Sequence, residues 1–324
     1  MVRGPGILAI LAILAPLLAF GEEKANATLS LGPVANFKVE ESKHFRICFQ
    51  AMPDPDLEKL LERTWRECDR IFEGFEILFA GTKEAPAPKK MNIYLADGRG
   101  DFERIRNWLI QTQNIAGKDA EILKNVTQFA VPGGMVFQRA PVLPKVELIR
   151  NAVVHGVAQS FLRAYLMRNG PCKDPPPLCL VGGFGYYMEF KLLDKAVVRY
   201  IDFDKYYAEQ GGNKLIQSEP LKEDNWARAV KQAARKTATL PAPDVILGID
   251  VDRLTPDMCG TMYAFISYCV SSAPGCKSFC ALLEKFRANG KATIAKDLLE
   301  AYACADAGKW NEAWRFYVLS ERFK

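Results

Sequence analysis

Histidine is scarce in this chain of 324 residues, which contains only His44 and His155. Any metal site must therefore depend on carboxylates or thiolates as well. The chain has no close Cys-x-x-Cys pair, and this disfavours a zinc site built from cysteines. It also has no Gly-x-Ser-x-Gly segment, the nucleophile elbow that many serine hydrolases use.

Charge of one sign is not in large excess either. The chain carries 43 basic and 38 acidic residues, which gives a formal net charge of +5. No basic cluster with interleaved aromatic residues occurs along the sequence. Nucleic acid is therefore not expected as a partner.

Long hydrophobic runs are missing after the N-terminus, where no segment approaches the ~18 apolar residues of a membrane helix. At the N-terminus itself, Arg3 precedes an apolar run over Ile7–Phe20 that ends in small residues. This pattern is typical of a secretory signal peptide. We expect residues 1–21 to be a cleaved signal, residues 22–33 a linker, and the mature protein extracytoplasmic (periplasmic or secreted) without a membrane span. An uncleaved hydrophobic anchor is the alternative.

Nine cysteines are few for this length, so a hydrophobic core rather than a disulfide scaffold must stabilise the fold. Export would place them in an oxidising environment, where disulfides are permitted. Cys172 and Cys179 flank the proline-rich segment CKDPPPLC and are the best candidates for a local disulfide. Cys48 on a predicted strand and Cys68 on the following helix could also pair. Because nine is odd, at least one thiol stays free or pairs between chains.

The pattern of apolar residues predicts an α+β fold. An α+β lobe over residues 34–193, with a small mixed sheet and long helices, precedes a helical C-terminal lobe over residues 194–324. Asp101 is expected to cap one of the helices. Strands are predicted over 44–50, 91–97 and 128–138, and helices over 57–72, 101–109, 145–167, 183–193, 223–237, 259–272, 276–288 and 293–318, the last broken near residue 308.

Two segments of the α+β lobe carry a pattern associated with zinc peptidases. The first is VVHGVAQSFL over residues 153–162, and the second is CLVGGFGYYME over residues 179–189. In this order, and with the NEAWRFYV segment near the C-terminus, the chain resembles the peptidase MA-like proteins. These are exported bacterial proteins in the gluzincin branch of the zincin metallopeptidases. The resemblance implies a zincin-like α+β lobe across most of the mature chain.

The resemblance also shows which catalytic residues have been replaced. The family carries His-Glu-x-x-His on one helix and a third ligand, Glu, at the start of a later helix. His155 keeps the first ligand position, whereas Gly156 stands at the base, Gln159 at the second ligand and Gly182 at the third. Tyr187 matches the family's tyrosine. We therefore expect zinc to be lost, no catalytic or metal-ligating residue to remain, and a vestigial cleft beside the 134–138 strand, where the family would bind an extended peptide.

Other interpretations of the same residues stay open. His155 could be a core histidine that a backbone carbonyl or Gln159 satisfies, and Glu189 could be a displaced ligand or base, or a solvated or ion-paired helix residue. The expected function is an exported, catalytically inactive peptidase-like protein whose cleft binds a peptide or a cell-envelope partner. One alternative is a hydrolase with relocated metal ligands or catalytic residues near His155 and Glu189. The other is a structural or interaction module of the cell envelope.

Overall fold

A computed structural model gives the arrangement of most of the chain. No helix in this part of the chain is both long enough and apolar enough to cross a membrane. The described residues are 29–50, 63–64, 66–74, 90–96, 99–117, 120, 123, 128–131, 134–138, 146–166, 176–201, 216–220, 225–236, 240–249, 254–289 and 295–323.

A six-stranded mixed sheet forms the first part of the fold, in the strand order β1-β2-β3-β4-β6-β5. The neighbours β3, β4 and β6 run parallel, and the other pairs are antiparallel. As a result β5, at one edge, runs opposite to the central strands. The strands are β1 (Leu29–Leu31), β2 (Val34–Glu41), β3 (Phe45–Phe49), β4 (Met91–Ala96), β5 (Gln128–Val131) and β6 (Gly134–Gln138).

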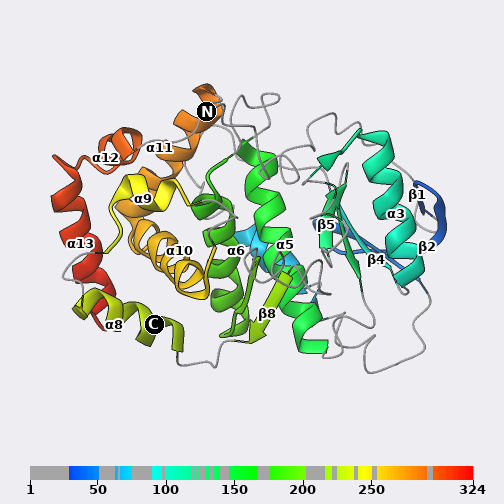
Figure 1. Cartoon of the computed structure of the whole chain (residues 1–324), viewed down its shortest axis with the longest axis horizontal. Coiled ribbons are helices and arrows are strands. Elements are labelled where there is room, and N and C mark those ends of the chain that lie inside the picture. Colours follow the sequence, from blue (N-terminus) through cyan, green and yellow to red (C-terminus); the bar gives the residue numbers. More distant parts are fainter. Residues whose placement is uncertain are drawn as a thin grey trace.

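Helices cover both faces of this sheet, which explains why β4 is buried along nearly its whole length. On one face, Phe102 and Ile105 of α3 (Arg99–Thr112) pack with the strand residues Cys48 and Val136. On the other face lie the helical residues 66–74 and helix α5 (Val146–Leu166). Figure 1 shows α3 and α5 on opposite sides of the strands.

The second half of the chain is mainly helical, and α6 lies between α5 and α10 (Figure 1). A short antiparallel pair, β7 with β8, follows α6. The elements are α6 (Leu178–Leu193), β7 (Val197–Ile201), β8 (Ile216–Pro220), α8 (Asn225–Lys236), α9 (Pro243–Leu247), α10 (Pro256–Cys269), α11 (Ala273–Asn289), α12 (Ala295–Ala301) and α13 (Ala307–Leu319).

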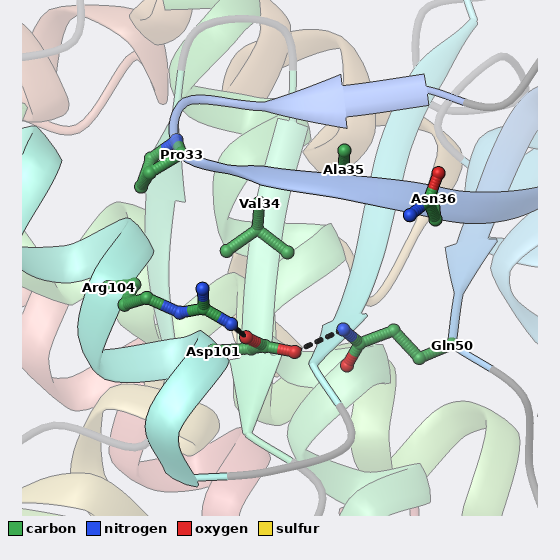
Figure 2. A pocket seen from close by; sticks show the side chains of 7 residues that line it. All are labelled: Pro33, Val34, Ala35, Asn36, Gln50, Asp101 and Arg104. Carbon is green, nitrogen blue, oxygen red and sulfur yellow. Dashed lines mark hydrogen bonds and ion pairs between the residues drawn. The ribbon is translucent and has the colours of Figure 1, made fainter.

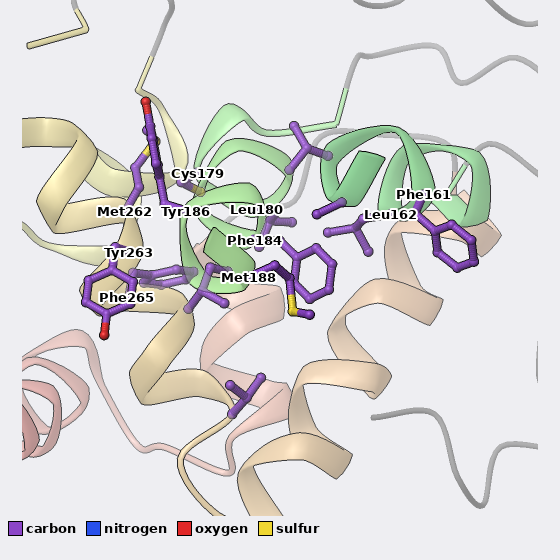
Figure 3. Packing of buried hydrophobic residues seen from close by; sticks show 14 of the residues in the cluster. Phe161, Leu162, Cys179, Leu180, Phe184, Tyr186, Met188, Met262, Tyr263 and Phe265 are labelled. Atoms are coloured by element: carbon purple, nitrogen blue, oxygen red, sulfur yellow. The ribbon is translucent and has the colours of Figure 1, made fainter. Parts of the chain in front are cut away.

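One hydrophobic core connects the sheet to the C-terminal helices. It runs from Phe45 in β3 through Phe184 in α6 and Phe265 in α10 to Trp310 and Trp314 in α13. Figure 3 shows side chains of α5, α6 and α10 within this layer. The expected boundary at residue 194 coincides with the end of α6, yet the same core continues across it.

The mixed α+β class agrees with the sequence prediction, and several element limits differ from it. The expected linker ends early, because Leu29–Leu31 already pair with β2. Helix α6 starts at Leu178, five residues before the predicted start. The last two helices are separated by residues 302–306, where Asp306 caps α13 by accepting a hydrogen bond from the Lys309 N–H at 2.8 Å. Strand β2 and the β7–β8 pair were not predicted.

Asp101 does not cap α3 as expected, because the helix begins at Arg99. Its carboxylate instead accepts hydrogen bonds from Gln50 and Arg104 at the wall of a hollow of about 410 Å³ (Figure 2). These bonds, the one from Gln50 first, hold the pKa of Asp101 below its ordinary value. The side chain therefore joins α3 to the end of β3.

Candidate functional site

The expected cleft residues lie where α5 and α6 pack against each other. Helix α5 has little amphipathic character, and all residues from Asn151 to Ala158 are buried. A helix that is apolar around its circumference must be enclosed on several sides. Here β6, α6 and α11 contact it. His155 therefore sits inside the protein, with 4% of its surface exposed.

A buried polar cluster surrounds His155. Its Nδ1 atom lies 2.6 Å from Oε1 of Glu189, whose side chain is fully buried. The amide of Asn151 donates to Oε2 of the same carboxylate at 2.7 Å and to the carbonyl of Lys195 at 3.1 Å. A carboxylate in the core is tolerated only when its oxygens have such partners. The cluster therefore fixes the orientation of the imidazole ring.

Tyr186 covers one side of this cluster. Its ring centroid lies 4.5 Å from that of His155 and 5.0 Å from that of Trp226 in α8. Its hydroxyl group lies 3.3 Å from Sγ of Cys259. The imidazole is thus enclosed by helices of both halves of the fold.

Glycines allow α6 to approach both of its neighbours closely. A Cβ atom at Gly185 would lie 2.8 Å from Cε1 of His155 and 3.0 Å from Cγ of Gln159. A Cβ atom at Gly183 would lie 2.7 Å from the backbone oxygen of Met262 in α10. Each distance is shorter than normal packing allows. The glycine-rich start of α6 is therefore explained by helix packing on two sides.

The positions of the missing ligands face each other. A Cβ atom at Gly182 would lie 3.6 Å from Nε2 of Gln159 and 3.3 Å from Cδ1 of Leu178, so residues 182 and 159 are neighbours across the contact. Gly156 faces β6, where a Cβ atom would lie 3.0 Å from Cζ of Phe137 and 3.2 Å from Cε of Met135. The space beside the base position is therefore filled by apolar side chains.

The structure brings most of the expected cleft residues together. His155, Gln159, Gly182 and Glu189 meet at the α5–α6 contact, and Gly156 lies beside them. Tyr187 is not part of this group, because it lines a separate hollow with residues of α10 and α13. Including it in the cleft was wrong.

Glu189 is an ion-paired helix residue, one of the roles considered from the sequence, and it is buried rather than solvated. Sequence reasoning missed Asn151 as its second partner. The signal that could have found it is the spacing of two polar residues, Asn151 and His155, one helical turn apart in an otherwise apolar helix.

The cysteine predictions have different outcomes. Cys172 lies outside the described residues, so its disulfide with the buried Cys179 stays a prediction. The alternative pairing of Cys48 with Cys68 is wrong, because both thiols are free and belong to the cores on opposite faces of the sheet. Successive strand residues point to opposite faces, and Cys48 points toward α3. Burial raises the pKa of Cys179, so its thiol stays protonated near neutral pH.

The residues at the cleft do not fit a zinc ion. His155 and Glu189 belong to residue types that bind zinc, but they contact each other through Nδ1 and Oε1 at 2.6 Å. Gln159 could offer an amide oxygen, a weak ligand, and Gly182 offers no side chain. Within the described ranges, no group of three His, Cys, Asp or Glu side chains is arranged to hold a metal ion.

Comparisons with known proteins add no relative. A scan against protein-family models finds no match, and a search of curated proteins finds none either.

Proposed function

We propose that this chain is an exported, catalytically inactive protein of zincin-like fold, a pseudo-metallopeptidase related to the peptidase MA-like group. The proposal is supported by residues far apart in sequence that meet at one place. Gln159 on α5 lies beside Gly182 on α6, and His155 lies beside Gly185 one turn further, in the order and with the helix types that the resemblance implies.

The observation that carries the proposal is the position of Gly182. Two ligands of one metal ion must point toward a common position. A Cβ atom at residue 182 would lie 3.6 Å from Nε2 of Gln159, and 3.3 Å from Cδ1 of Leu178 in its own helix, so residues 182 and 159 are neighbours across the α5–α6 contact. A chance pair of packed helices would not need to align these two positions.

The contact between His155 and Glu189 supports the same origin. A histidine that binds a metal through one ring nitrogen commonly donates the other N–H to a carboxylate, which fixes the ring. Glu189 stands at this place, 2.6 Å from Nδ1. We interpret the pair as an outer-shell contact that has persisted as a structural element after loss of the metal ligands.

A remaining role for the cleft is peptide binding. The strand expected to accept a peptide, Gly134–Gln138, is already paired on both sides, with β4 and β5. The edge of the sheet is β5 instead, which pairs only with β6 in the described part of the chain. An extended peptide could add to β5 through its backbone groups. A cell-envelope protein with an exposed strand would fit in the same way.

Restoring the two missing ligands tests the proposal. We expect the natural protein to retain no stoichiometric zinc after purification, and Gln159→His with Gly182→Glu to create a zinc site with His155. The single variants Gln159→His and Gly182→Glu are the controls, because each leaves one ligand missing. Zinc content and isothermal titration measure the result. A folded double variant that binds zinc no better than either single variant would contradict the proposed relationship.

The second candidate function is a hydrolase that uses His155 with Glu189. The favouring observation is their contact, because a carboxylate beside imidazole orients the base in many hydrolases. Substituting His155 by Gln should then abolish hydrolysis of a casein or ester substrate in a protein that remains folded. The pseudo-peptidase proposal expects no such activity in either protein. A purely structural envelope module would show neither zinc binding after restoration nor hydrolysis.

A further inference from the structure

A trough on the helical half of the molecule lies away from the His155 cluster. It consists of two hollows that share Ala227. The first, of about 690 Å³, lies between α6, α10 and α13. The second, of about 620 Å³, lies along α8 and the C-terminal residues. Arg322 lines the first and its neighbour Phe323 lines the second, so the two hollows are adjacent.

Cations without ion-pair partners border this trough. Lys191 and Arg322 line the first hollow, and three cations of α8 line the second. The α8 cations are Arg228, Lys231 and Arg235. In the part of the chain that the structure describes, none of these five lies within 4.0 Å of a carboxylate oxygen. Elsewhere on the surface Lys285 and Lys90 are ion-paired. Unpaired cations gathered in a depression attract anions.

The trough is not uniformly basic, because two carboxylates also border it. Asp194 lies near Lys191, and Glu321 lies near the cations of α8. The five cations still outnumber the two acids. Arg228, Lys231 and Arg235 follow at intervals of three and four residues, so they lie along one face of α8. A row of charges suits an extended ligand better than a single small ion.

Neutral hydroxyl groups form the floor of the first hollow. Tyr187, Tyr263 and Tyr317 line it together with Ser267. The hydroxyls of Tyr317 and Ser267 are 2.7 Å apart. Burial raises the pKa of Tyr187 to about 12 and also raises those of Tyr263 and Tyr317. These groups therefore remain protonated donors, and the half-buried rings of Tyr187 and Tyr317 can stack against a ligand ring.

The walls contain helix ends rather than strand edges. Residues at the C-terminal ends of α6, α10 and α13, including Asp194, Ser271 and Arg322, surround the first hollow. The last carbonyls of a helix lack intrahelical donors and can accept hydrogen bonds from a ligand. An extended peptide would find no strand to pair with here. A ligand with many hydroxyl groups and regularly spaced acidic groups would match the row of cations, the hydroxyl donors and the helix carbonyls.

We propose that this trough binds an extended acidic polysaccharide, with its acidic groups along α8 and a sugar ring over the tyrosines of the first hollow. The surface contributes cations for the acids, hydroxyl donors and helix carbonyls for the sugar hydroxyls, and aromatic rings for stacking. The site is independent of the α5–α6 cleft and of the pseudo-peptidase proposal.

Titration of the full mature chain with defined oligosaccharides tests the inference. The probes are a hexamer of galacturonic acid, neutral maltohexaose, poly-glutamate and a single-stranded DNA oligomer. We expect the acidic hexamer to bind, to bind more weakly as salt is raised, and to be preferred over the other three probes. Failure to bind at low salt, or equal binding of maltohexaose, would overturn the proposal. Tighter binding of poly-glutamate or DNA would assign the trough to an acidic peptide or to nucleic acid instead.

Matched charge removals locate the site. Arg228→Gln with Arg235→Gln should weaken binding of the acidic hexamer about ten-fold, because surface charge pairs contribute modestly and add along the row. The control removes two exposed cations elsewhere, Lys277→Gln with Lys309→Gln, and should change the affinity less than about two-fold. If both double variants lose affinity equally, binding depends on net charge and the trough is not the site. Lys191→Gln, at the other end of the trough, provides an independent variant should the α8 pair fail to fold.

Discussion

His155 and Glu189 join α5 to α6 through a 2.6 Å contact between Nδ1 and Oε1 in the interior of the protein. The contact holds a carboxylate where it has no access to water, with Asn151 as its second partner. Removing His155 takes one of its partners from the buried carboxylate, and the loss of such a partner in the core costs more than the pair itself stabilises. The pair thus gives the histidine in the buried middle of α5 a structural role.

Breaking the pair should destabilise the fold more than a surface substitution would. We expect His155→Gln to lower the free energy of unfolding by about 3 kcal/mol, because Glu189 loses a partner in the core. Replacing both residues by leucine should cost less than that single change, since no charge remains buried. Urea unfolding of the two variants measures the difference. A His155→Gln protein within 0.5 kcal/mol of the parent, on the order of a surface substitution, would mean that the contact has no structural role.

The second prediction concerns the close approach of α6 to α5. Gly185→Ala should lower the free energy of unfolding by about 1–3 kcal/mol, because the new Cβ would lie 2.8 Å from His155 Cε1. Gly100→Ala in α3 is the matched control, since no atom lies within 4 Å of its Cβ position. That change should stabilise by up to about 1 kcal/mol through helix propensity. Equal effects of the two substitutions would argue against the packing shown at Gly185.

Alkaline pH should weaken the fold through its buried thiols. Burial raises the pKa of Cys48 and of Cys269 from 9.0 to about 12. Above pH 9 the unfolded chain releases these protons while the folded chain keeps them. The free energy of unfolding therefore falls as the pH rises from 9 toward 12, by up to about 1.4 kcal/mol per pH unit for each thiol. Urea unfolding in a reducing agent at pH 8, 9 and 10 measures this slope.

Cys269→Ala provides the control for the thiol effect. It removes one of the titrating thiols, so its stability should fall less steeply between pH 9 and 10 than that of the parent. The comparison uses slopes, because the substitution also leaves a cavity that lowers stability at every pH. Parallel slopes for the two proteins would show that Cys269 does not titrate on unfolding.

The disulfide between Cys172 and Cys179 is a separate prediction. Cys179 occupies the first turn of α6 and is fully buried. If the protein is exported, peptide mapping without reduction should recover the two cysteines in one linked fragment. The short loop limits the stabilisation to a few kcal/mol at most. Recovery of both residues as free thiols from protein secreted into an oxidising medium would contradict the pairing.

The spacing of apolar residues along the sequence predicted the elements that are buried in a regular pattern. Alternation gave β3, and the long apolar segment gave α5 to within a residue at either end. Strand β2, VANFKVEE, was missed because it is mostly exposed and only Val34 and Phe37 are buried. Strand β8, IQSEP, is too polar to stand out, whereas β7, VVRYI, has the composition of a strand and was overlooked. Helix α6 was started too late because its glycines were taken as a boundary, whereas they serve close packing.

The sequence predicted only those relationships in the candidate site that lie within one helix. The i, i+4 spacing places His155 and Gln159 on the same side of α5 without any structure. That Glu189 of α6 contacts His155 of α5 depends on how the two helices pack and cannot be obtained from spacing. Tyr187 shows the reverse case: its place in the motif suggested the cleft, but the rotation of α6 turns it toward α10 and α13.

The last prediction concerns the base position, where the structure adds a constraint that sequence could not provide. Gly156→Glu gains helix propensity of up to about 1 kcal/mol. Its Cβ, however, would lie 3.0 Å from Cζ of Phe137, which is 1% exposed and cannot move into solvent. Added to the zinc-restoring pair Gln159→His and Gly182→Glu, it should therefore lower stability by about 1–3 kcal/mol without changing zinc affinity.

Trimming the opposing side chain separates the packing effect from other causes. Phe137→Leu should recover part of that loss in the variant that carries Gly156→Glu, and should only destabilise the parent, where it leaves a cavity. Urea unfolding gives the four values of this cycle, and their coupling measures the clash. We expect no peptide hydrolysis by the zinc-binding triple variant, because Phe137 and Met135 fill the space that a base and its water would need. Hydrolysis of a casein substrate by that variant, or additive stabilities in the cycle, would show that the cleft beside Gly156 is open after all.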